Sequence, residues 1–405
     1  MKVYADNAAT TKMSKTAIDA MVAAMNDTFG NPSSLYSIGQ KAKEALDDAR
    51  ARAARCLGAD SGEILFTGGG SEADNQALLT AAKLGEAAGK KHMISTKFEH
   101  HAILHTLAKL EKERGFTVTL LDVHENGIVR PEEVAAAIRP DTALVSVMFA
   151  NNELGTVQPI AEIGRICRER GVLFHTDAVQ AVGHVHINVK EQNIDMLSLA
   201  GHKFHGPKGV GLLYARKGIR LTNLIEGGAQ EGGRRAGTEN VQGIVAMVAA
   251  LEEATAHIDE YTARVTPLRD RLIAGLEKIP HSVLNGDRER RLPATVNFCF
   301  EGIEGESLLL MLDDKGISAS SGSACTSGSL DPSHVLLAIG RPHEVAHGSL
   351  RLSLGDDITE EQVDYLIKSV TEVVEYLRGM SPIWRDLCAG KKPFILPYHT
   401  STSSL

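Results

Sequence analysis

A single lysine stands directly after an apolar run, where a spare positive charge is unusual. Residues 197–203 read Leu-Ser-Leu-Ala-Gly-His-Lys, so Lys203 follows the expected end of a buried strand. A lysine amine can form a Schiff base with an aldehyde, and catalysis near neutral pH favours a lysine pKa lowered to about 7–8. The alternative is an ordinary solvated surface lysine. Lys203 is therefore a candidate catalytic amine.

A glycine-rich turn follows another short apolar run. Residues 68–75 read Gly-Gly-Gly-Ser-Glu-Ala-Asp-Asn and lead into a helix-length segment. Glycines let the backbone approach an anion, and Ser71 can donate from the first helical turn, which favours phosphate. The same letters fit a dinucleotide pattern, but weakly, because the next apolar run ends at Lys97 rather than at an acid. Three interpretations of this turn stay open at this point. It could be a phosphate cradle, a tight turn without a ligand, or part of a nicotinamide dehydrogenase.

An acidic residue ends a third apolar run. Asp177 closes residues 172–177, and Gln180 stands one turn beyond it. A carboxylate at a strand end is often an N-cap, but it can also pair with a protonated ring nitrogen. An aldehyde cofactor with a phosphate tail and a pyridinium ring would use Ser71, Asp177 and Lys203 together. The combination predicts such a cofactor more strongly than any of the three residues alone.

Several histidines could move protons or bind a metal. His100 follows a strand-like run, where its imidazole could stack on a planar ring or simply start a helix. His101 and His105 lie one helical turn apart, with no third ligand evident. Residues 343–347, His-Glu-Val-Ala-His, match a zinc-protease pattern, but the flanking proline and glycine leave no room for the extended helix that this pattern needs. We expect no metal site.

Cys325 lies in an unusual setting. It is centred in residues 320–329, Ser-Ser-Gly-Ser-Ala-Cys-Thr-Ser-Gly-Ser, whereas cysteine is normally buried in apolar cores. With a pKa near 8.5 only ~3% of the thiol is ionised at pH 7, so a nucleophilic role needs a base or cation nearby. An incidental loop thiol is the alternative. Arg351, in the strand-like run 349–354, could bind a substrate carboxylate bidentately or form a surface ion pair.

The elements that position these residues alternate along the chain. Between about residues 13 and 255, helix-length segments separate short apolar runs at 63–67, 92–96, 117–122, 143–149, 172–177, 194–199 and 210–215. This alternation predicts an α/β fold with a mostly parallel central sheet covered by helices on both faces. Ligand sites of such sheets lie at the carboxyl ends of the strands, where the candidate residues stand.

The pattern changes near residue 256. A long helical segment, 257–279, is followed by strand-like runs at 294–300 and 349–354 and a closing helical segment, 359–377. We therefore predict a large cofactor-binding domain of residues 13–255. A smaller α/β domain of residues 1–12 plus 256–385 would carry the cysteine loop, and residues 386–405 would form a loose C-terminal tail.

Composition excludes several classes of protein. The 405 residues are 43% hydrophobic and 23% charged, with a net charge of −8, as in a soluble globule without a basic face for nucleic acid. Apolar stretches fall short of the ~20 residues of a membrane span, and the first residues lack a signal-peptide pattern. Five scattered cysteines without a CxxC pair argue against a disulfide framework. We predict a cytoplasmic protein that binds neither nucleic acid nor membranes.

Six motifs together resemble the NifS/IscS cysteine desulfurases, which are class-V, fold-type-I pyridoxal-phosphate enzymes. They lie at residues 6–11, 29–34, 151–155, 201–203, 235–238 and 323–328. The resemblance covers about residues 2–380 and implies the fold-type-I transferase fold, pyridoxal 5'-phosphate and a homodimer with active sites at the subunit interface. It also implies conversion of L-cysteine to L-alanine, with sulfur carried on Cys325 as a persulfide. An acceptor or iron–sulfur scaffold protein would receive that sulfur, for iron–sulfur clusters (nitrogenase included) or other sulfur metabolism.

The resemblance also implies roles for individual residues. Lys203 would hold the cofactor as a Schiff base, His100 would stack on its ring, and Cys325 would be the nucleophile. The remaining assignments are Gly70, Ser71 and His202 at the phosphate, Thr238 at the phosphate of the partner subunit, Asp177 at the pyridine nitrogen, Gln180 at the phenolic oxygen, and Asn152 and Arg351 at the substrate carboxylate.

The chain departs from the family pattern in two places. Many relatives carry serine at the position of Ala200, so one phosphate hydrogen bond is expected to be missing. The residues after about 380 differ from the scaffold-docking ends of the IscS branch. A selenocysteine lyase or aminotransferase of the same fold is the nearest alternative, and Cys325 argues against it because transamination needs no thiol. A non-catalytic cluster scaffold would need several clustered cysteines.

Overall fold

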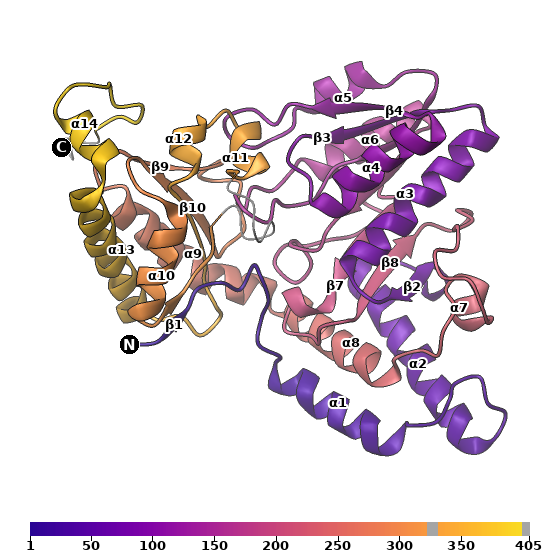
Figure 1. Ribbon diagram of the computed structural model, residues 1–405. Coiled ribbons are helices and arrows are strands. Elements are labelled where there is room, and N and C mark those ends of the chain that lie inside the picture. Colours follow the sequence, from indigo (N-terminus) through magenta and orange to yellow (C-terminus); the bar gives the residue numbers. More distant parts are fainter. Residues whose placement is uncertain (322–330, 399–405) are drawn as a thin grey trace.

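A seven-stranded sheet forms the centre of the larger lobe (Figure 1). The structure, a computed structural model, describes residues 1–321 and 331–398. The strand order is β2-β8-β7-β6-β5-β3-β4, and β8 runs antiparallel to both of its neighbours while the other pairs are parallel. The predicted mostly parallel sheet is confirmed. Its strands are β2 (Ile64–Thr67), β3 (His92–Thr96), β4 (Thr117–Leu121), β5 (Thr142–Ser146), β6 (Leu173–Asp177), β7 (Met196–Ala200) and β8 (Gly211–Ala215).

Helices cover both faces of this sheet, because its central strands are apolar on both sides. On one face, Leu65 of β2 and Met93 of β3 pack in a core with residues of α3 (Gly70–Ala87) and α4 (His101–Arg114). On the other face, Ile64 and Phe66 share a second core with three further helices. These are α2 (Ser37–Leu57), α6 (Ile160–Arg170) and α8 (Val241–Ala256). The short elements of this lobe are η1 (Ser61–Glu63), α5 (Pro131–Ala137), η2 (Gly201–Lys203) and α7 (Gln230–Gly233).

The smaller lobe has its own sheet and core. Strand β10 (Thr295–Phe300) lies between β9 (Ser282–Leu284) and β12 (Ser349–Ser353), antiparallel to both. Three helices share a core with these strands: α9 (Ile258–Leu276), α10 (Gly305–Asp314) and α13 (Glu360–Met380). The N-terminal strand β1 (Val3–Tyr4) pairs with β11 (Ile317–Ser318), which ties the start of the chain to this lobe. The domain boundaries near residues 12 and 256 stay a prediction.

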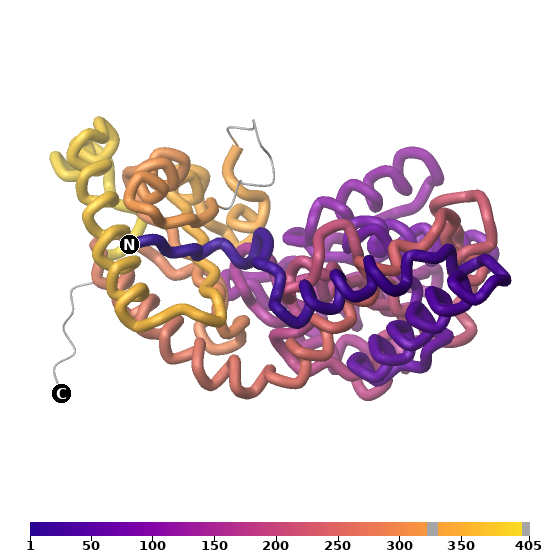
Figure 2. Tube along the Cα trace, turned by 90° about the horizontal axis from the view of Figure 1, so that it is seen from below, coloured from indigo at the N-terminus to yellow at the C-terminus, as the bar shows by residue number. Residues whose placement is uncertain are grey.

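The chain passes between the lobes close to its N-terminus. Figure 2 shows the indigo N-terminal segment running from β1 in the small lobe to α1 (Lys15–Asp27) on the large lobe. A second connection is made by α11 (His334–Ala338), because its Val335 and Leu336 belong to the core of the large lobe. The short helix α12 (His343–Ala346) follows it. Among the described residues, no helix has the length and apolar character needed to cross a membrane.

The predicted loose tail is wrong for residues 386–398. After α14 (Pro382–Cys388), the chain packs back on the small lobe, where Glu301 accepts hydrogen bonds from the backbone N–H groups of Ile395 (2.8 Å) and Leu396 (2.9 Å). The His281 ring stacks on Phe394 at a centroid distance of 3.6 Å. Glu301 stands 94 residues before Ile395, so the local sequence of the tail carries no sign of this contact.

Candidate active site

The Lys203 side chain lies where the two lobes meet the N-terminal segment. Lys203 ends η2, the single turn that follows β7, and is half-buried. Its Nζ donates hydrogen bonds to the carbonyl oxygens of Ala8 (2.7 Å) and Ala9 (2.9 Å). Gln180 also donates to the Ala8 carbonyl, at 2.9 Å. The N-terminal segment is therefore part of the site, which the sequence analysis missed because backbone carbonyls carry no side-chain signal.

Asp177 lies beside the lysine on the neighbouring strand. It ends β6, and its register partner on β7 is Ser198, so the carboxyl ends of two adjacent parallel strands carry the acid and the amine. The buried Asp177 carboxylate accepts one hydrogen bond from the Val179 N–H at 2.9 Å. Burial raises the pKa of Asp177 to about 6, and the Val179 N–H and the charge of Lys203 oppose that rise. Asp177 and Lys203 are thus electrostatically coupled.

Two more carboxyl groups are buried near Asp177. Burial raises the pKa of Glu99 to about 8, although Glu99 accepts hydrogen bonds from the Thr96 hydroxyl and the Met148 N–H. Burial, followed by the neighbouring charge of Asp177, raises the pKa of Asp74 well above its ordinary value. Glu99 therefore holds its proton at neutral pH, whereas Asp177, with its lower pKa, is ionised there.

His100 starts a helix, which is one of the two alternatives stated for it, and its stacking on a cofactor ring stays a prediction. It is the N-cap of α4, and its Nδ1 accepts a hydrogen bond from the Ala102 N–H at 3.1 Å. Burial lowers the pKa of His100, and the charge of Lys203 lowers it further, together with His334 and His105. His100 is consequently neutral, with its proton on Nε2, and it lies within the electrostatic reach of Lys203.

The glycine-rich turn borders a cavity of about 580 Å³ at the N-terminus of α3. Gly70 and Ser71 line it, together with His202 and Ala200. A side chain at residue 70 would place its Cβ 2.6 Å from a methyl of Val179, so only glycine fits there. The backbone N–H groups at a helix start favour an anion, and this helix is 18 residues long. The turn therefore has the form of a phosphate cradle, with the Ala200 methyl in place of a hydroxyl donor.

Two further lining residues were missed by the sequence analysis. Thr10 shares a hydrogen bond with the His202 ring, with 3.1 Å between Oγ1 and Nδ1, and Lys208 adds a positive charge. Glu72 also lines the cavity, but its carboxylate is paired with Arg235 at 2.9 Å, which offsets its charge. The signal that could have identified Lys208 is its position five residues after Lys203, which is visible in the sequence.

Arg351 is buried on β12 and reaches towards the N-terminal segment. Its Nη1 donates to the Asn152 carbonyl oxygen at 2.9 Å, and its Nη2 donates to Asp6 at 2.8 Å. Its Nε is buried and has no hydrogen-bond partner among the described residues. Arg351 therefore forms an ion pair, as one alternative from the sequence had it, but with Asp6 and from a buried side chain rather than on the surface. Asp6 was not singled out, because its partner lies 345 residues away.

Two predicted site residues are not found among the residues of this site. Cys325 lies outside the described residues. Thr238 is exposed in the loop between α7 and α8 and is not one of the described residues that line the cavity. This position leaves it accessible to another subunit, as the resemblance implies.

The alternative motifs take ordinary structural roles. The His343 and His347 rings meet edge to face at 4.5 Å, and His101 packs against His105 and His334 at 4.8 and 4.6 Å. The part of the chain that the structure describes contains no group of three or more His, Cys, Asp or Glu side chains suited to a metal ion. The glycine motif follows β2, an edge strand antiparallel to β8, so it does not open the parallel unit of a dinucleotide fold.

The comparison with known protein families assigns the chain. A family profile described as "Aminotransferase class-V" matches residues 3–366. The chain belongs to the class-V aminotransferase family. Enzymes of this family depend on pyridoxal phosphate, and the α/β architecture described above is their fold-type-I fold.

Curated relatives and solved structures of this family resemble the chain over most of its length. The cysteine desulfurase IscS of Methanosarcina thermophila is 57% identical over 381 residues, which cover 94% of each chain. The cysteine desulfurase IscS of Clostridium botulinum (strain Hall) is 54% identical over 394 residues, 96% of this chain and 99% of that one. A solved NifS-like protein superposes with a TM-score of 0.87 at 37% identity, covering 93% of this chain and 100% of that one.

The residues present fit pyridoxal phosphate. The cofactor needs an amine for its aldehyde, an acid for its ring nitrogen and a cradle for its phosphate. Lys203 and the ionised Asp177 supply the first two within electrostatic reach of each other. The turn at Gly70, where there is no space for an added Cβ, supplies the phosphate cradle.

Proposed function

We propose that this chain is a pyridoxal-phosphate-dependent cysteine desulfurase. It would convert L-cysteine to L-alanine and pass the sulfur, as a persulfide on Cys325, to an acceptor protein of iron–sulfur cluster assembly or other sulfur metabolism. The observation that carries the proposal is the Lys203 amine, which follows β7 beside Asp177 at the end of the adjacent β6 and lowers the pKa of both Asp177 and His100. Two curated relatives more than 50% identical to the chain are named cysteine desulfurases.

The chain's own residues can perform the proton transfers of this reaction. When bound, pyridoxal phosphate supplies an aldehyde that takes up amines and a ring that withdraws electrons from the substrate α-carbon. Lys203 would hold the cofactor through Nζ and, once the substrate amine has replaced it, remove the α-proton. The Ala8 and Ala9 carbonyls keep Nζ at the site during this exchange. Asp177 is placed to keep the ring nitrogen protonated.

His100 is placed to exchange a proton with the substrate, and Arg351 is placed to orient the substrate through its carboxylate. His100 accepts a hydrogen bond at Nδ1, so its Nε2 carries the proton that it can exchange with the substrate. Arg351 would bind the substrate carboxylate, since its buried Nε has no partner among the described residues and its two other nitrogens already donate towards the site. Asn152 is fixed beside it through its carbonyl oxygen.

The sulfur step balances without another reactant. The Cys325 thiolate attacks the substrate sulfur and forms an S–S bond. The substrate C–S bond breaks, and its electron pair stays on carbon, which takes up a proton. Cysteine and one enzyme thiol thereby become alanine and one enzyme persulfide. Cys325 lies outside the described residues, so this assignment rests on the motif at residues 323–328.

The activity test is the product formed from L-cysteine by the cofactor-loaded protein. We expect alanine, together with a protein mass increased by one sulfur atom that maps to Cys325. Cys325→Ser should retain the cofactor and lose the persulfide, whereas Cys388→Ser, which removes an exposed thiol on α14, should behave as the wild type. 3-Mercaptopyruvate in place of alanine would indicate transamination, and pyruvate with free sulfide would indicate β-elimination; either product would contradict the proposal.

The lysine assignment has a separate test. Borohydride reduction should fix the cofactor covalently to the wild-type chain, because it reduces a carbon–nitrogen double bond at Lys203. Lys203→Ala should yield no covalent adduct, and Lys208→Ala should still yield one, because Lys208 lines only the phosphate cradle. An adduct that persists in Lys203→Ala would show that another amine holds the cofactor.

We further propose a homodimer that buries the surface of α1 and the start of α2. Phe29 and Leu35 are 65% and 94% exposed, and Val22 of α1 is also exposed, so this surface is apolar and open. Arg50 of α2 pairs with Glu231 of α7, which joins this surface to the loop that carries Thr238. Leu35→Asp should give a monomer in light scattering, with weakened cofactor binding if Thr238 of the partner contacts the phosphate.

The cytoplasm is the compartment we propose for this activity. Cys56, Cys167, Cys299 and Cys388 are all free thiols, as a reducing environment allows. Fractionation of cells that express the tagged chain would test this placement.

A further inference from the structure

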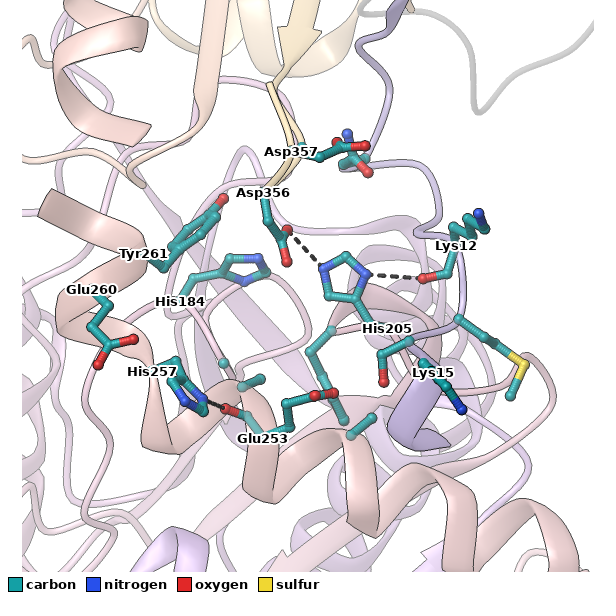
Figure 3. Close-up of a pocket in the computed structure, with 18 of the residues that line it drawn as sticks. Lys12, Lys15, His184, His205, Glu253, His257, Glu260, Tyr261, Asp356 and Asp357 are labelled. Carbon is teal, nitrogen blue, oxygen red and sulfur yellow. Dashed lines mark hydrogen bonds and ion pairs between the residues drawn. The ribbon is translucent and has the colours of Figure 1, made fainter. Parts of the chain in front are cut away.

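A second cavity, of about 950 Å³, lies at the junction of the two lobes (Figure 3). An ion pair crosses its wall, with 3.0 Å between His205 Nε2 and Asp356 Oδ1. His205 follows Lys203 by two residues, and Asp356 follows the end of β12, the strand that carries Arg351. The pair therefore links the loop of the proposed cofactor lysine directly to the strand of the proposed substrate arginine.

His205 is held in place from every side. Its φ is +66°, in the left-handed region, which is uncommon for residues other than glycine, although histidine, asparagine and aspartate adopt it more often than most. The His205 N–H donates to the Thr11 hydroxyl at 2.8 Å, and its carbonyl accepts from the Ser14 N–H at 3.0 Å. Such backbone strain persists only where the surroundings enforce it, and at this position it aims the ring at Asp356.

The ring contacts of His205 define its charge. Nδ1 lies 2.9 Å from the Lys12 carbonyl oxygen, which can only accept, so Nδ1 carries a proton. Nε2 faces the Asp356 carboxylate, which also accepts. Both ring nitrogens therefore donate, and the side chain is an imidazolium. Figure 3 draws the contacts of His205 with Lys12 and Asp356 as dashed lines.

Other titratable groups face the same pair. Glu253 of α8, Tyr261 of α9 and His184 line the cavity around the His205–Asp356 pair. Burial alone lowers the pKa of His205, but the hydrogen bond and charge of Asp356 outweigh it and raise that pKa, with smaller contributions from the Lys12 carbonyl and Glu253. His184 is neutral, because burial lowers its pKa to about 4. The remaining titratable side chains that line the cavity are Lys12, Lys15, His257, Glu260, Arg264 and Asp357.

We propose that His205 and Asp356 are positioning residues that hold the Arg351 strand in register with the Lys203 loop, so that the substrate carboxylate and the catalytic amine are correctly spaced. Neither side chain lines the phosphate cradle, so neither is a catalytic residue. The inference rests on the proposed desulfurase function, because it assumes that Arg351 binds the substrate carboxylate. It predicts an effect on substrate binding that leaves the cofactor in place.

The main experiment measures KM and kcat for L-cysteine with the holoenzyme. Asp356→Asn keeps the shape of the side chain and removes its charge, so KM should rise about tenfold, with kcat changed less than about twofold. The visible absorbance and the dissociation constant of the cofactor should stay at wild-type values. Asp357→Asn is the matched control, because it removes the adjacent carboxylate on the wall of the same cavity and should leave KM unchanged.

A second variant separates positioning from folding. His205→Asn removes the ring and tolerates the positive φ, since asparagine adopts this conformation more readily than most residues. It should raise KM as Asp356→Asn does, and the double variant should raise it no further, because both changes remove one interaction. Asp356→Glu, which restores the charge, should recover part of the lost affinity.

The pH dependence provides a readout that a merely structural role would not change. In the wild type, KM should rise on the alkaline side as His205 loses its proton. Asp356→Asn should start from the high KM and show no such step. A wild-type KM and pH step in Asp356→Asn would overturn the inference, as would losses of kcat and cofactor with KM unchanged. Absence of alanine formation by the wild type would instead refute the proposed function, so the two failures are distinguishable.

Discussion

At the residue scale, the buried carboxyl groups behind the cofactor site differ in charge. Asp74, Glu99 and Asp177 are all buried, and burial raises the pKa of each. The Val179 N–H and the charge of Lys203 oppose the rise at Asp177, whose pKa of about 6 lies below the value of about 8 for Glu99. A negative charge in a low-dielectric setting stabilises a protonated ring nitrogen more strongly than it would in water. Asp177 is therefore ionised at neutral pH while Glu99 keeps its proton.

Replacing Asp177 tests this role. Asp177→Asn preserves an acceptor for the Val179 N–H but removes the charge, so we expect kcat to fall by at least about 100-fold. The cofactor should remain reducible onto Lys203. Comparison of turnover and covalent fixation in the same preparation checks both statements. An unchanged kcat would show that the ring nitrogen has no need of this carboxylate.

Glu99 makes stability depend on pH. Its pKa is raised to about 8 in the folded chain from an ordinary value of 4.5, so the folded state keeps a proton that the unfolded state has lost between these values. The free energy of unfolding should therefore fall as pH rises across this window. Glu99→Gln removes this titration and should make the slope less negative, measured by urea unfolding at a series of pH values. Identical slopes in the two proteins would contradict the raised pKa.

At the element scale, the cradle depends on how α3 begins against its neighbours. Gly70 is the first residue of α3, and it packs against Val179, two residues after Asp177. The phosphate cradle and the ring partner are thus joined by the contact between the Gly70 backbone at the start of α3 and the Val179 side chain in the turn after β6. Any side chain at residue 70 would push these two elements apart.

Gly70→Ala should consequently weaken cofactor binding. Its Cβ would lie 2.6 Å from the Val179 methyl, and relieving such a contact costs about 1–3 kcal/mol. We expect the dissociation constant for pyridoxal phosphate to rise about tenfold or more, measured by absorbance titration of the apoprotein. Gly62→Ala is the control, because no described atom lies within 4 Å of its added Cβ. Equal affinities in the two variants would show that the close approach at Gly70 is not needed.

At the scale of the whole molecule, segments distant in sequence hold the lobes and their ends together. Asp6 of the N-terminal segment pairs with Arg351, and the same segment provides the carbonyls that bind Lys203. At the other end, the carbonyl oxygen of the buried Leu396 lies 2.7 Å from Nδ1 of His281, which holds the C-terminal segment on the small lobe. The N-terminal segment therefore connects the lobes, and the C-terminal segment packs on the small lobe.

The packing of the C-terminal segment can be measured by paired substitutions. Leu396 is 5% exposed and Ile395 is 47% exposed, so only the first loses buried apolar contact on truncation. Leu396→Ala should lower the free energy of unfolding by about 2 kcal/mol or more, and Ile395→Ala by less than about 0.5 kcal/mol. Denaturant unfolding of both variants checks this difference. Equal effects would mean that the segment is not packed in solution.

The sequence by itself determined the elements and the residues at their ends. The apolar run at 92–96 matches β3, the closing helical segment at 359–377 overlaps α13, and Asp177 stands at the end of its strand as predicted. Periodicity reports burial within a few turns, and strand ends in a parallel sheet share one edge, so these features can be read locally. The motifs also indicated the family.

Only the tertiary structure decided which distant groups meet. The Ala8 carbonyl on Lys203, Asp6 on Arg351 and Asp356 on His205 are contacts between residues far apart in the chain. No local pattern encodes them, because each depends on how two lobes pack around a shared segment. The course of residues 386–398 was mispredicted for the same reason, since Pro, Ser and Thr near a terminus suggest disorder until a partner such as Glu301 is in place.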